Sequence, residues 1–230
     1  MYLAIEGVIG VGKTTLARML QPAFKASILL EIFEENPFLS DFYADRERYA
    51  FQTQIFFLLS RYHQQRRSVP DALARDENLI ADYTFAKDGL FASINLHGDE
   101  LEMYYRVHEA LAEKIAQPDL IVYLRASTEI LMRRIALRDR SYERNMERAY
   151  IDELNRAYEL YFNSSHTGSY HPSAPILMID TNDLDFVHNL EHLEYVEEQI
   201  RLTIKQVPIQ SALPLEFTED SPVEQDSRSE

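Results

Sequence analysis

The 230-residue chain has no cysteine and no long apolar run. The lack of cysteine excludes disulfides, thiolate zinc sites and cysteine nucleophiles. The best apolar candidate for a membrane span, Ile55 to Leu59, lies between Gln54 and Arg61, whereas a spanning helix needs about 20 apolar residues. Because the first residues are already typical of a strand and a loop, we expect no secretory signal, no membrane partner and a cytoplasmic location.

Basic residues are scarce as well. The chain has 23 Lys and Arg against 38 Asp and Glu, which gives a formal net charge of −15. This balance opposes wrapping around DNA or RNA, because no general basic surface is present to release counterions, and we expect no nucleic-acid partner. An apolar content of 46% fits one globular domain, predicted at residues 1–207. Residues 208–230 are acidic and contain Pro214 and Pro222, which predicts a disordered tail.

Glycine is the third scarce residue, and its placement is uneven. Half of the six glycines fall within one six-residue window: Gly7, Gly10 and Gly12. The window continues into Lys13 and Thr14, so it fills every specified position of the pattern glycine, four free residues, Gly-Lys-Ser/Thr. A β-prone segment precedes it, and a segment with helical spacing that stops at Pro22 follows it. This context favours a phosphate-binding loop over a glycine-rich turn without a ligand.

A loop of this kind has a defined chemistry. Glycines let successive backbone N–H groups point at phosphate oxygens, and the helix N-terminus adds partial positive charge. Lys13 would neutralise the outer phosphates, and the Thr14 hydroxyl would ligate a bridging magnesium ion. The sequence therefore predicts Mg²⁺ as cofactor and the following triphosphate-binding residues: Gly7, Gly10, Gly12, Lys13, Thr14 and Thr15.

The remaining pattern predicts an α/β fold. Five short apolar segments are expected to be buried strands: Tyr2 to Glu6, Ile28 to Ile32, Leu79 to Asp82, Leu120 to Leu124, and Ile176 to Asp180. Helical stretches lie between them: Ser40 to Arg67, Asp99 to Ala116, Thr128 to Leu137, Glu143 to Phe162, and Leu184 to Ile204. In these segments apolar and polar residues do not alternate, and helices separate the segments. This pattern indicates a five-stranded parallel sheet with helices on both faces. Ligands then bind at the carboxyl ends of the strands.

Two carboxylates stand at these expected strand ends. Glu31 closes the second strand and Asp82 closes the third. Either residue alone could be an ordinary surface acid. Two of them beside a phosphate loop favour a site, because one carboxylate can hold magnesium and another can accept a hydroxyl proton.

The long helix predicted at Ser40 to Arg67 carries a polar stripe. Tyr43, Gln54 and Arg61 are eleven and seven positions apart, which returns them to nearly one helical face. An amide and a guanidinium can read the edge of a base, and a tyrosine hydroxyl can hold a sugar. The same stripe is typical of the wet side of an amphipathic helix, and the residues alone favour that interpretation over a binding site.

Further motifs follow in a fixed order over Met1 to Lys205: Ile5-Glu6-Gly7, Glu31 with Asn36-Pro37-Phe38-Leu39, Phe42-Tyr43, Gln54 to Arg61, Asp82 to Asp88, Phe91-Ala92-Ser93, Pro118 to Leu124, and Arg134, Arg138, Arg140 and Glu143. This ordered set resembles the deoxyribonucleoside kinases, especially the bacterial deoxyguanosine and deoxyadenosine kinases. The resemblance implies a P-loop kinase fold.

The resemblance also implies roles for individual residues. Glu31 matches the general base that takes the proton of the nucleoside 5′-hydroxyl. Tyr43 and Glu143 match the residues that bind the sugar 3′-hydroxyl. The residues that match the base-reading group are Gln54, Arg61 and Asp88, and Asp82 matches the acid near the magnesium ion.

The arginine-rich stretch at residues 133–148 resembles the lid of the family. Arg134 and Arg138 would bind ATP, while Arg138 and Arg140 would place positive charge on the transferring phosphoryl group. The turn Asp180-Thr181-Asn182 resembles the family's adenine-binding turn. One departure concerns Tyr83, which follows Asp82 where many relatives have an arginine. Lys87 or a lid arginine could then balance the charge near Glu31.

The activity implied by this resemblance is phosphorylation of the 5′-hydroxyl of a deoxyribonucleoside, more specifically a purine one, by ATP in nucleotide salvage. Family members are commonly dimers, which implies a homodimer. Three alternatives remain at this point. A monophosphate kinase resembling thymidylate kinase would use Arg61 as a phosphate ligand. A nucleotide-dependent switch or assembly ATPase would need no base-reading stripe, and a pure binding module would need no general base.

Overall fold

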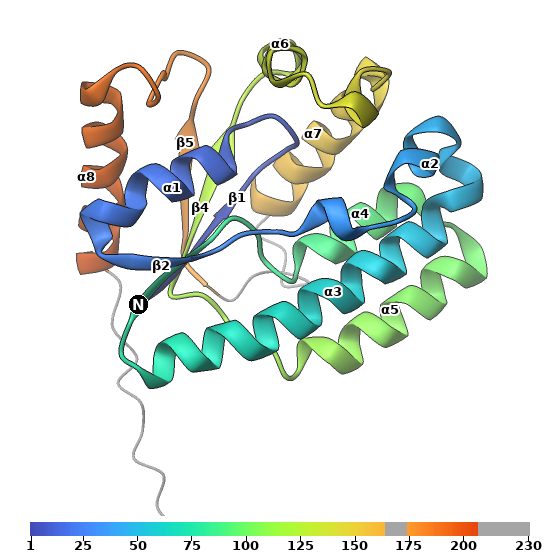
Figure 1. The fold of residues 1–230 in the computed structure, drawn as a ribbon, viewed down its shortest axis with the longest axis horizontal. Helices are drawn as coiled ribbons and strands as arrows, with labels where there is room; N and C mark the ends of the chain where they lie inside the picture. The colour runs from blue at the N-terminus through green and yellow to red at the C-terminus, as the bar shows by residue number, and fades with distance from the viewer. Residues whose placement is uncertain (164–173, 207–230) are drawn as a thin grey trace, which may run out of the picture.

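The computed structural model describes residues 1–163 and 174–206 of the chain. Its strands are β1 (Tyr2–Glu6), β2 (Ala26–Leu29), β3 (Asn78–Ala81), β4 (Leu120–Arg125) and β5 (Ile176–Asp180). They form one five-stranded, all-parallel sheet in the order β2-β3-β1-β4-β5, which confirms the predicted sheet (Figure 1). The predicted tail, residues 208–230, lies outside the described residues.

The register of the sheet brings the strand ends together. Ala4 of the central strand β1 pairs with Ala81 of β3 on one side and with Ile121 of β4 on the other. The side chains of β1 are buried throughout, as expected for a strand that is covered on both faces. Because all strands run parallel, the segments that follow β1, β2 and β3 leave the sheet at the same edge.

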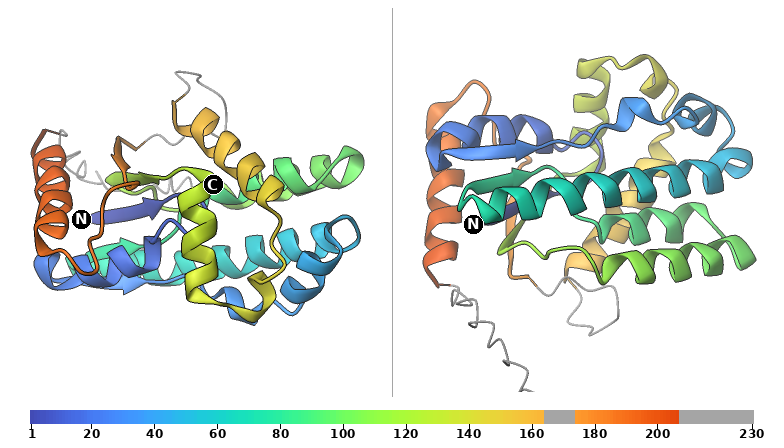
Figure 2. Two further views of the ribbon diagram at one scale, coloured as in Figure 1. Left: turned by 90° about the horizontal axis from the view of Figure 1, so that it is seen from above. Right: turned by 60° about the horizontal axis from the view of Figure 1, so that its bottom comes forward.

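The helices are α1 (Lys13–Phe24), α2 (Leu39–Ala44), α3 (Arg46–Ala74), α4 (Lys87–Asn95), α5 (Gly98–Ala112), α6 (Thr128–Arg138), α7 (Arg148–Asn163) and α8 (Leu190–Gln206), with short 3-10 turns η1 (Phe33–Glu35) and η2 (Ser141–Glu143). Helix α1 packs with α8, whereas α3, α4, α5 and α7 pack with one another (Figures 1 and 2). Right-handed crossovers place α1 on one face of the sheet and α3, α4, α5 and α7 on the other. The reason is that the chain moves across the sheet in one direction from β1 to β2 and in the opposite direction from β2 through β3 and β4 to β5.

The long helix predicted at Ser40 to Arg67 is wrong as a single element. Asp45 interrupts it with a non-helical backbone, and its side chain accepts a hydrogen bond of 3.3 Å from the N–H of Arg48 as an N-cap. Tyr43 therefore lies on α2, while Gln54 and Arg61 lie on α3. Helix α3 also continues through Pro70 to Ala74.

Other boundaries differ in ways that affect the site. Strand β2 ends at Leu29, so Glu31 lies two residues beyond it instead of closing it. Helix α1 does not stop at Pro22 but ends at Phe24, where the left-handed Lys25 donates its N–H to the carbonyl of Pro22 at 3.2 Å. Helix α4 was not predicted, and Glu143 lies in η2 and not in the helix that begins at Arg148.

The main core lies between the sheet and its two helical layers. It is formed by the apolar side chains of the strands and by the inner faces of the helices around them. In the described ranges, no helix combines the length and the apolar character that crossing a bilayer requires.

Two leucines of α7 offer a matched test of this packing. Leu154 is 0% exposed, whereas Leu160 on the same helix is 72% exposed. We expect Leu154→Ala to lower the free energy of unfolding by about 2–5 kcal/mol through lost burial and a cavity. Leu160→Ala should stay within about 0.5 kcal/mol of the wild type. Chemical denaturation measures both, and equal effects of the two changes would contradict the described packing of α7.

Candidate active site

The loop between β1 and α1 has the backbone that its glycines predict. Gly7 and Gly10 have φ values of +146° and +89°, which side chains other than hydrogen rarely allow. A Cβ at Gly7 would lie 2.5 Å from the carbonyl oxygen of Leu124, and one at Gly10 would lie 2.7 Å from the side chain of Ile135. Helix α1 begins at Lys13, so the N–H groups of its first turn point back toward the loop, as an anion-binding site requires.

Lys13 folds back over this loop. Its Nζ donates to the carbonyl oxygens of Gly7 at 2.6 Å and Val8 at 3.2 Å. Burial and the nearby ammonium of Lys87 lower the pKa of Lys13 to about 8, although the surrounding carboxylates act in the opposite direction. A bound anion would favour the charged ammonium of Lys13 and so offset the effect of burial.

Asp82 joins the phosphate loop to the segment after β2. One carboxylate oxygen accepts the Thr14 hydroxyl, and the other accepts the backbone N–H of Glu31 at 2.8 Å. These oxygen donors fit a magnesium ion, which is usually held by one or two carboxylates, waters and substrate phosphates. The described residues contain no cluster of three or more acidic, histidine or cysteine side chains that could hold a metal without such phosphates.

The carboxylate of Glu31 lies between two buried cations. Arg61 binds Oε1 through Nε at 3.0 Å and also through Nη2, and Lys87 donates to Oε2 at 2.7 Å. Burial alone would raise the pKa of Glu31. The charges and hydrogen bonds of Arg61 and Lys87 outweigh burial and hold this pKa well below its ordinary range. Glu31 is therefore ionised at neutral pH.

Arg61 also reaches a second acid. Its Nη1 pairs with the carboxylate of Asp88, which is completely buried at the start of α4. Asp88 lies behind Arg61 and does not line the cavity. Gln54 and Thr53 do line it, and the buried hydroxyl of Thr53 has no hydrogen-bond partner in the described part of the chain.

Aromatic and charged side chains close the opposite wall. Tyr43 stacks on Tyr142 with ring centroids 6.1 Å apart. Burial, Tyr150 and Glu143 raise the pKa of Tyr43 well above its ordinary value, so its hydroxyl keeps its proton. Arg138 holds Glu143 through two hydrogen bonds, one of them 2.7 Å from Nε to Oε2, and Nη1 of Arg140 lies 3.7 Å from Glu143.

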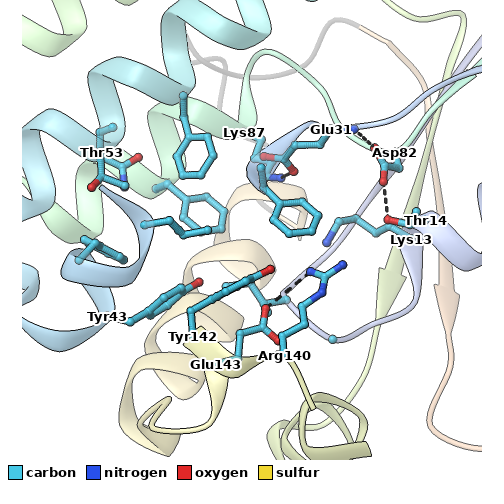
Figure 3. A pocket seen from close by; sticks show the side chains of 18 of the residues that line it. Lys13, Thr14, Glu31, Tyr43, Thr53, Asp82, Lys87, Arg140, Tyr142 and Glu143 are labelled. Atoms are coloured by element: carbon cyan, nitrogen blue, oxygen red, sulfur yellow. Dashed lines mark hydrogen bonds and ion pairs between the residues drawn. The ribbon is translucent and has the colours of Figure 1, made fainter. Parts of the chain in front are cut away.

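Most of the predicted site residues meet in one space, which we call the central cavity (Figure 3). Thr53 and Tyr43 lie toward one end of it and Lys13, Thr14 and Asp82 toward the other. The predicted residues that line it are Gly10, Lys13, Thr14, Glu31, Tyr43, Gln54, Arg61, Asp82, Arg138, Arg140 and Glu143. Four polar lining residues were not among the predicted site residues: Thr53, Lys87, Tyr142 and Tyr150. Of these, only Lys87 had a signal in the sequence, as a candidate to balance the charge near Glu31.

Three other predicted ATP ligands, Gly12, Thr15 and Arg134, face a second depression beyond the phosphate loop, whereas Gly7 lines neither space. It is lined by Gly12, Thr15, Arg134, Arg138 and Asn182, among others. Arg134 does not line the central cavity. Its guanidinium donates to the carbonyl oxygen of Thr181 at 2.7 Å and to that of Val11 at 3.2 Å, so it ties the turn after β5 to the phosphate loop.

Comparison with known proteins agrees with this geometry. The deoxynucleoside kinase family matches residues 3–205 of the chain. A deoxyguanosine kinase of Bacillus subtilis is 34% identical over 87% of this chain and 96% of its own length, and a deoxyadenosine/deoxycytidine kinase of the same organism is 28% identical over 88% and 92%. The structure of a deoxyadenosine kinase from M. mycoides with bound dATP superimposes with a TM-score of 0.74, at 27% identity, over 87% of this chain and all of that one. The chain belongs to the deoxynucleoside kinase family, which confirms the class of enzyme that its motifs predicted.

The lowered pKa of Lys13 makes a testable difference to stability. Between its folded pKa of about 8 and its ordinary value of 10.5, the unfolded chain holds a proton that the folded chain has lost. Stability due to this group therefore rises with pH across that window. Lys13→Met removes the effect. The unfolding free energy of the wild type should therefore increase relative to that of the variant between pH 8 and pH 10. Parallel curves in denaturant titrations over these pH values would contradict the assignment.

Proposed function

We propose that this kinase transfers the γ-phosphoryl group of ATP to the 5′-hydroxyl of a purine deoxyribonucleoside. The observation that carries the proposal is the ionised carboxylate of Glu31, which shares one cavity with Lys13 of the phosphate loop and with the polar side chains of Gln54 and Thr53. Such a cavity offers a place for phosphates at one end and for a base at the other.

In the proposed reaction Glu31 accepts the proton of the 5′-hydroxyl. The nucleoside oxygen forms a bond to the γ-phosphorus, the bond between that phosphorus and the β–γ bridging oxygen breaks, and ADP leaves. Lys13 and the loop N–H groups hold the phosphates in line. Lys87, with its Nζ 2.7 Å from Glu31, supplies positive charge beside the transferring phosphoryl group.

Mg²⁺ would be held by Thr14 and Asp82 together with the ATP phosphates. When bound, it neutralises phosphate charge and orients the β- and γ-phosphoryl oxygens. The existing hydrogen bond from Thr14 to Asp82 keeps both oxygen donors at the mouth of the loop.

The sugar and the donor have separate supports. We propose that Tyr43 donates to the 3′-hydroxyl and that Glu143 accepts from it, because both line the wall of the cavity opposite Glu31 (Figure 3). Residues 133–148 would act as a lid in which Arg138 and Arg140 turn from Glu143 to the phosphates as ATP binds. The second depression beside Asn182 would take the adenine of ATP, with Arg134 bracing that turn.

Base recognition is assigned to Gln54, Thr53 and Arg61, with Asp88 fixing Arg61 from behind. A purine is favoured because the similar proteins include deoxyguanosine and deoxyadenosine kinases. The alternative of a monophosphate kinase requires Arg61 to hold a phosphate. Two carboxylates, Glu31 and Asp88, already surround this guanidinium, which disfavours an anion beside them.

A panel of substrates with ATP and magnesium tests the activity. We expect monophosphate product from deoxyguanosine or deoxyadenosine, and none from the corresponding monophosphates. Glu31→Gln should lower turnover by about 10²- to 10⁴-fold, the usual contribution of a general base, with nucleoside binding retained in calorimetry. Glu31→Asp, which keeps the charge, serves as the control. Turnover on monophosphates alone, or ATP hydrolysis that ignores nucleosides, would refute the proposal.

We propose a homodimer formed through helices α3 and α5. These helices pack side by side (Figure 2), and large apolar side chains are exposed on both: Leu59 and Leu73 on α3 and Met103 on α5. Large apolar side chains that are exposed on neighbouring helices are commonly covered by a second subunit.

Light scattering tests the dimer. The wild type should have twice the mass of one 26.9 kDa chain. Met103→Glu should shift it toward a single chain, because a buried charge opposes association. Leu160→Glu, on the exposed face of α7, should leave the mass unchanged. A single-chain mass for the wild type would disprove the dimer.

A further inference from the structure

Arg61 is placed differently from a residue that only reads a base. Three of its nitrogen atoms are committed to carboxylates, Nε and Nη2 to Glu31 and Nη1 to Asp88. All three side chains are buried or nearly so. The guanidinium thus lies between the acid at the phosphate end and the acid behind the base end of the central cavity.

We propose that Arg61 is a positioning residue for Glu31, so that it couples recognition of the base to the orientation of the carboxylate that accepts the 5′-hydroxyl proton. This inference rests on the proposed function of Glu31. It extends the role of Arg61 from substrate affinity to the chemical step.

The geometry of the contact supports positioning. A guanidinium is a planar fork with fixed donor directions, so contacts from Nε and Nη2 define how the Glu31 carboxylate faces. Lys87 donates from a flexible chain to the other oxygen and cannot define that plane alone. Asp88 in turn fixes the guanidinium, because its carboxylate is completely buried at the first turn of α4.

Gln54 provides the matched control. It lies on the same helix and lines the same cavity, but no hydrogen bond joins it to Glu31 in the part of the chain that the structure describes. Arg61→Met and Gln54→Met therefore both remove a proposed base reader, while only the first removes a partner of Glu31.

The experiment compares these two variants on two substrates. One is the preferred deoxynucleoside, and the other is benzimidazole 2′-deoxyriboside, which has the shape of a purine nucleoside but no polar atom on its six-membered ring. We expect Arg61→Met to lower kcat on both substrates, by about 10²-fold as for a misplaced reacting group. Gln54→Met should act mainly through a higher KM for the natural substrate, so that its kcat falls much less than that of Arg61→Met.

Arg61→Lys is the second variant, to be used in case Arg61→Met does not fold. It keeps the charge but loses the two-point contact, so kcat should still fall. An Arg61 variant that raises only KM for the natural substrate, with the kcat of the wild type, would overturn the inference. The kcat and KM values on the natural substrate decide the matter even if the analogue is not phosphorylated. Turnover of nucleosides by the wild type tests the proposed function separately.

Discussion

The site depends on one carboxylate held by two buried cations. Glu31 lies in a coil segment, beyond the hydrogen bonds of β2, and would be free to turn without Arg61 and Lys87. Both cations come from helices of the layer opposite α1, so the packing of α3 and α4 against the sheet is also what places the proposed base. The same contacts that orient Glu31 also lower its pKa, so the carboxylate is ionised but is a weaker base.

The sheet supplies the rest of the alignment. Parallel pairing of β3 with β1 and β2 sets Asp82 beside both the phosphate loop and the backbone of Glu31. Glu6, at the end of β1, holds the segment after β3 by accepting the N–H of Thr84 at 2.6 Å and its hydroxyl at 2.8 Å. The proposed phosphate-binding loop and the strand ends that present acids are therefore connected by buried hydrogen bonds, and a shift of one strand would misplace both.

Local patterns were sufficient for the sheet and the phosphate loop, because glycine spacing and apolar runs act over a few residues. The break at Asp45 was not predicted, since a helical pattern continues across it and only the cap geometry reveals the change of direction. Helix α4 was missed because its first residues, Lys87 and Asp88, are buried charged groups whose partners come from other elements. Thr53 has no sequence signal at all, since its importance rests on a hydroxyl left without a partner in the folded chain.

The most direct measurement of the central claim is a crystal structure of the ternary complex with a purine deoxynucleoside, magnesium and a non-hydrolysable ATP analogue. With Glu31 as the base, we expect the 5′-oxygen at hydrogen-bond distance from a Glu31 carboxylate oxygen, about 2.6–3.2 Å, and in line with the γ-phosphorus above Lys13. A nucleoside whose 5′-oxygen points away from Glu31, with another side chain in contact with it, would contradict the role proposed for Glu31.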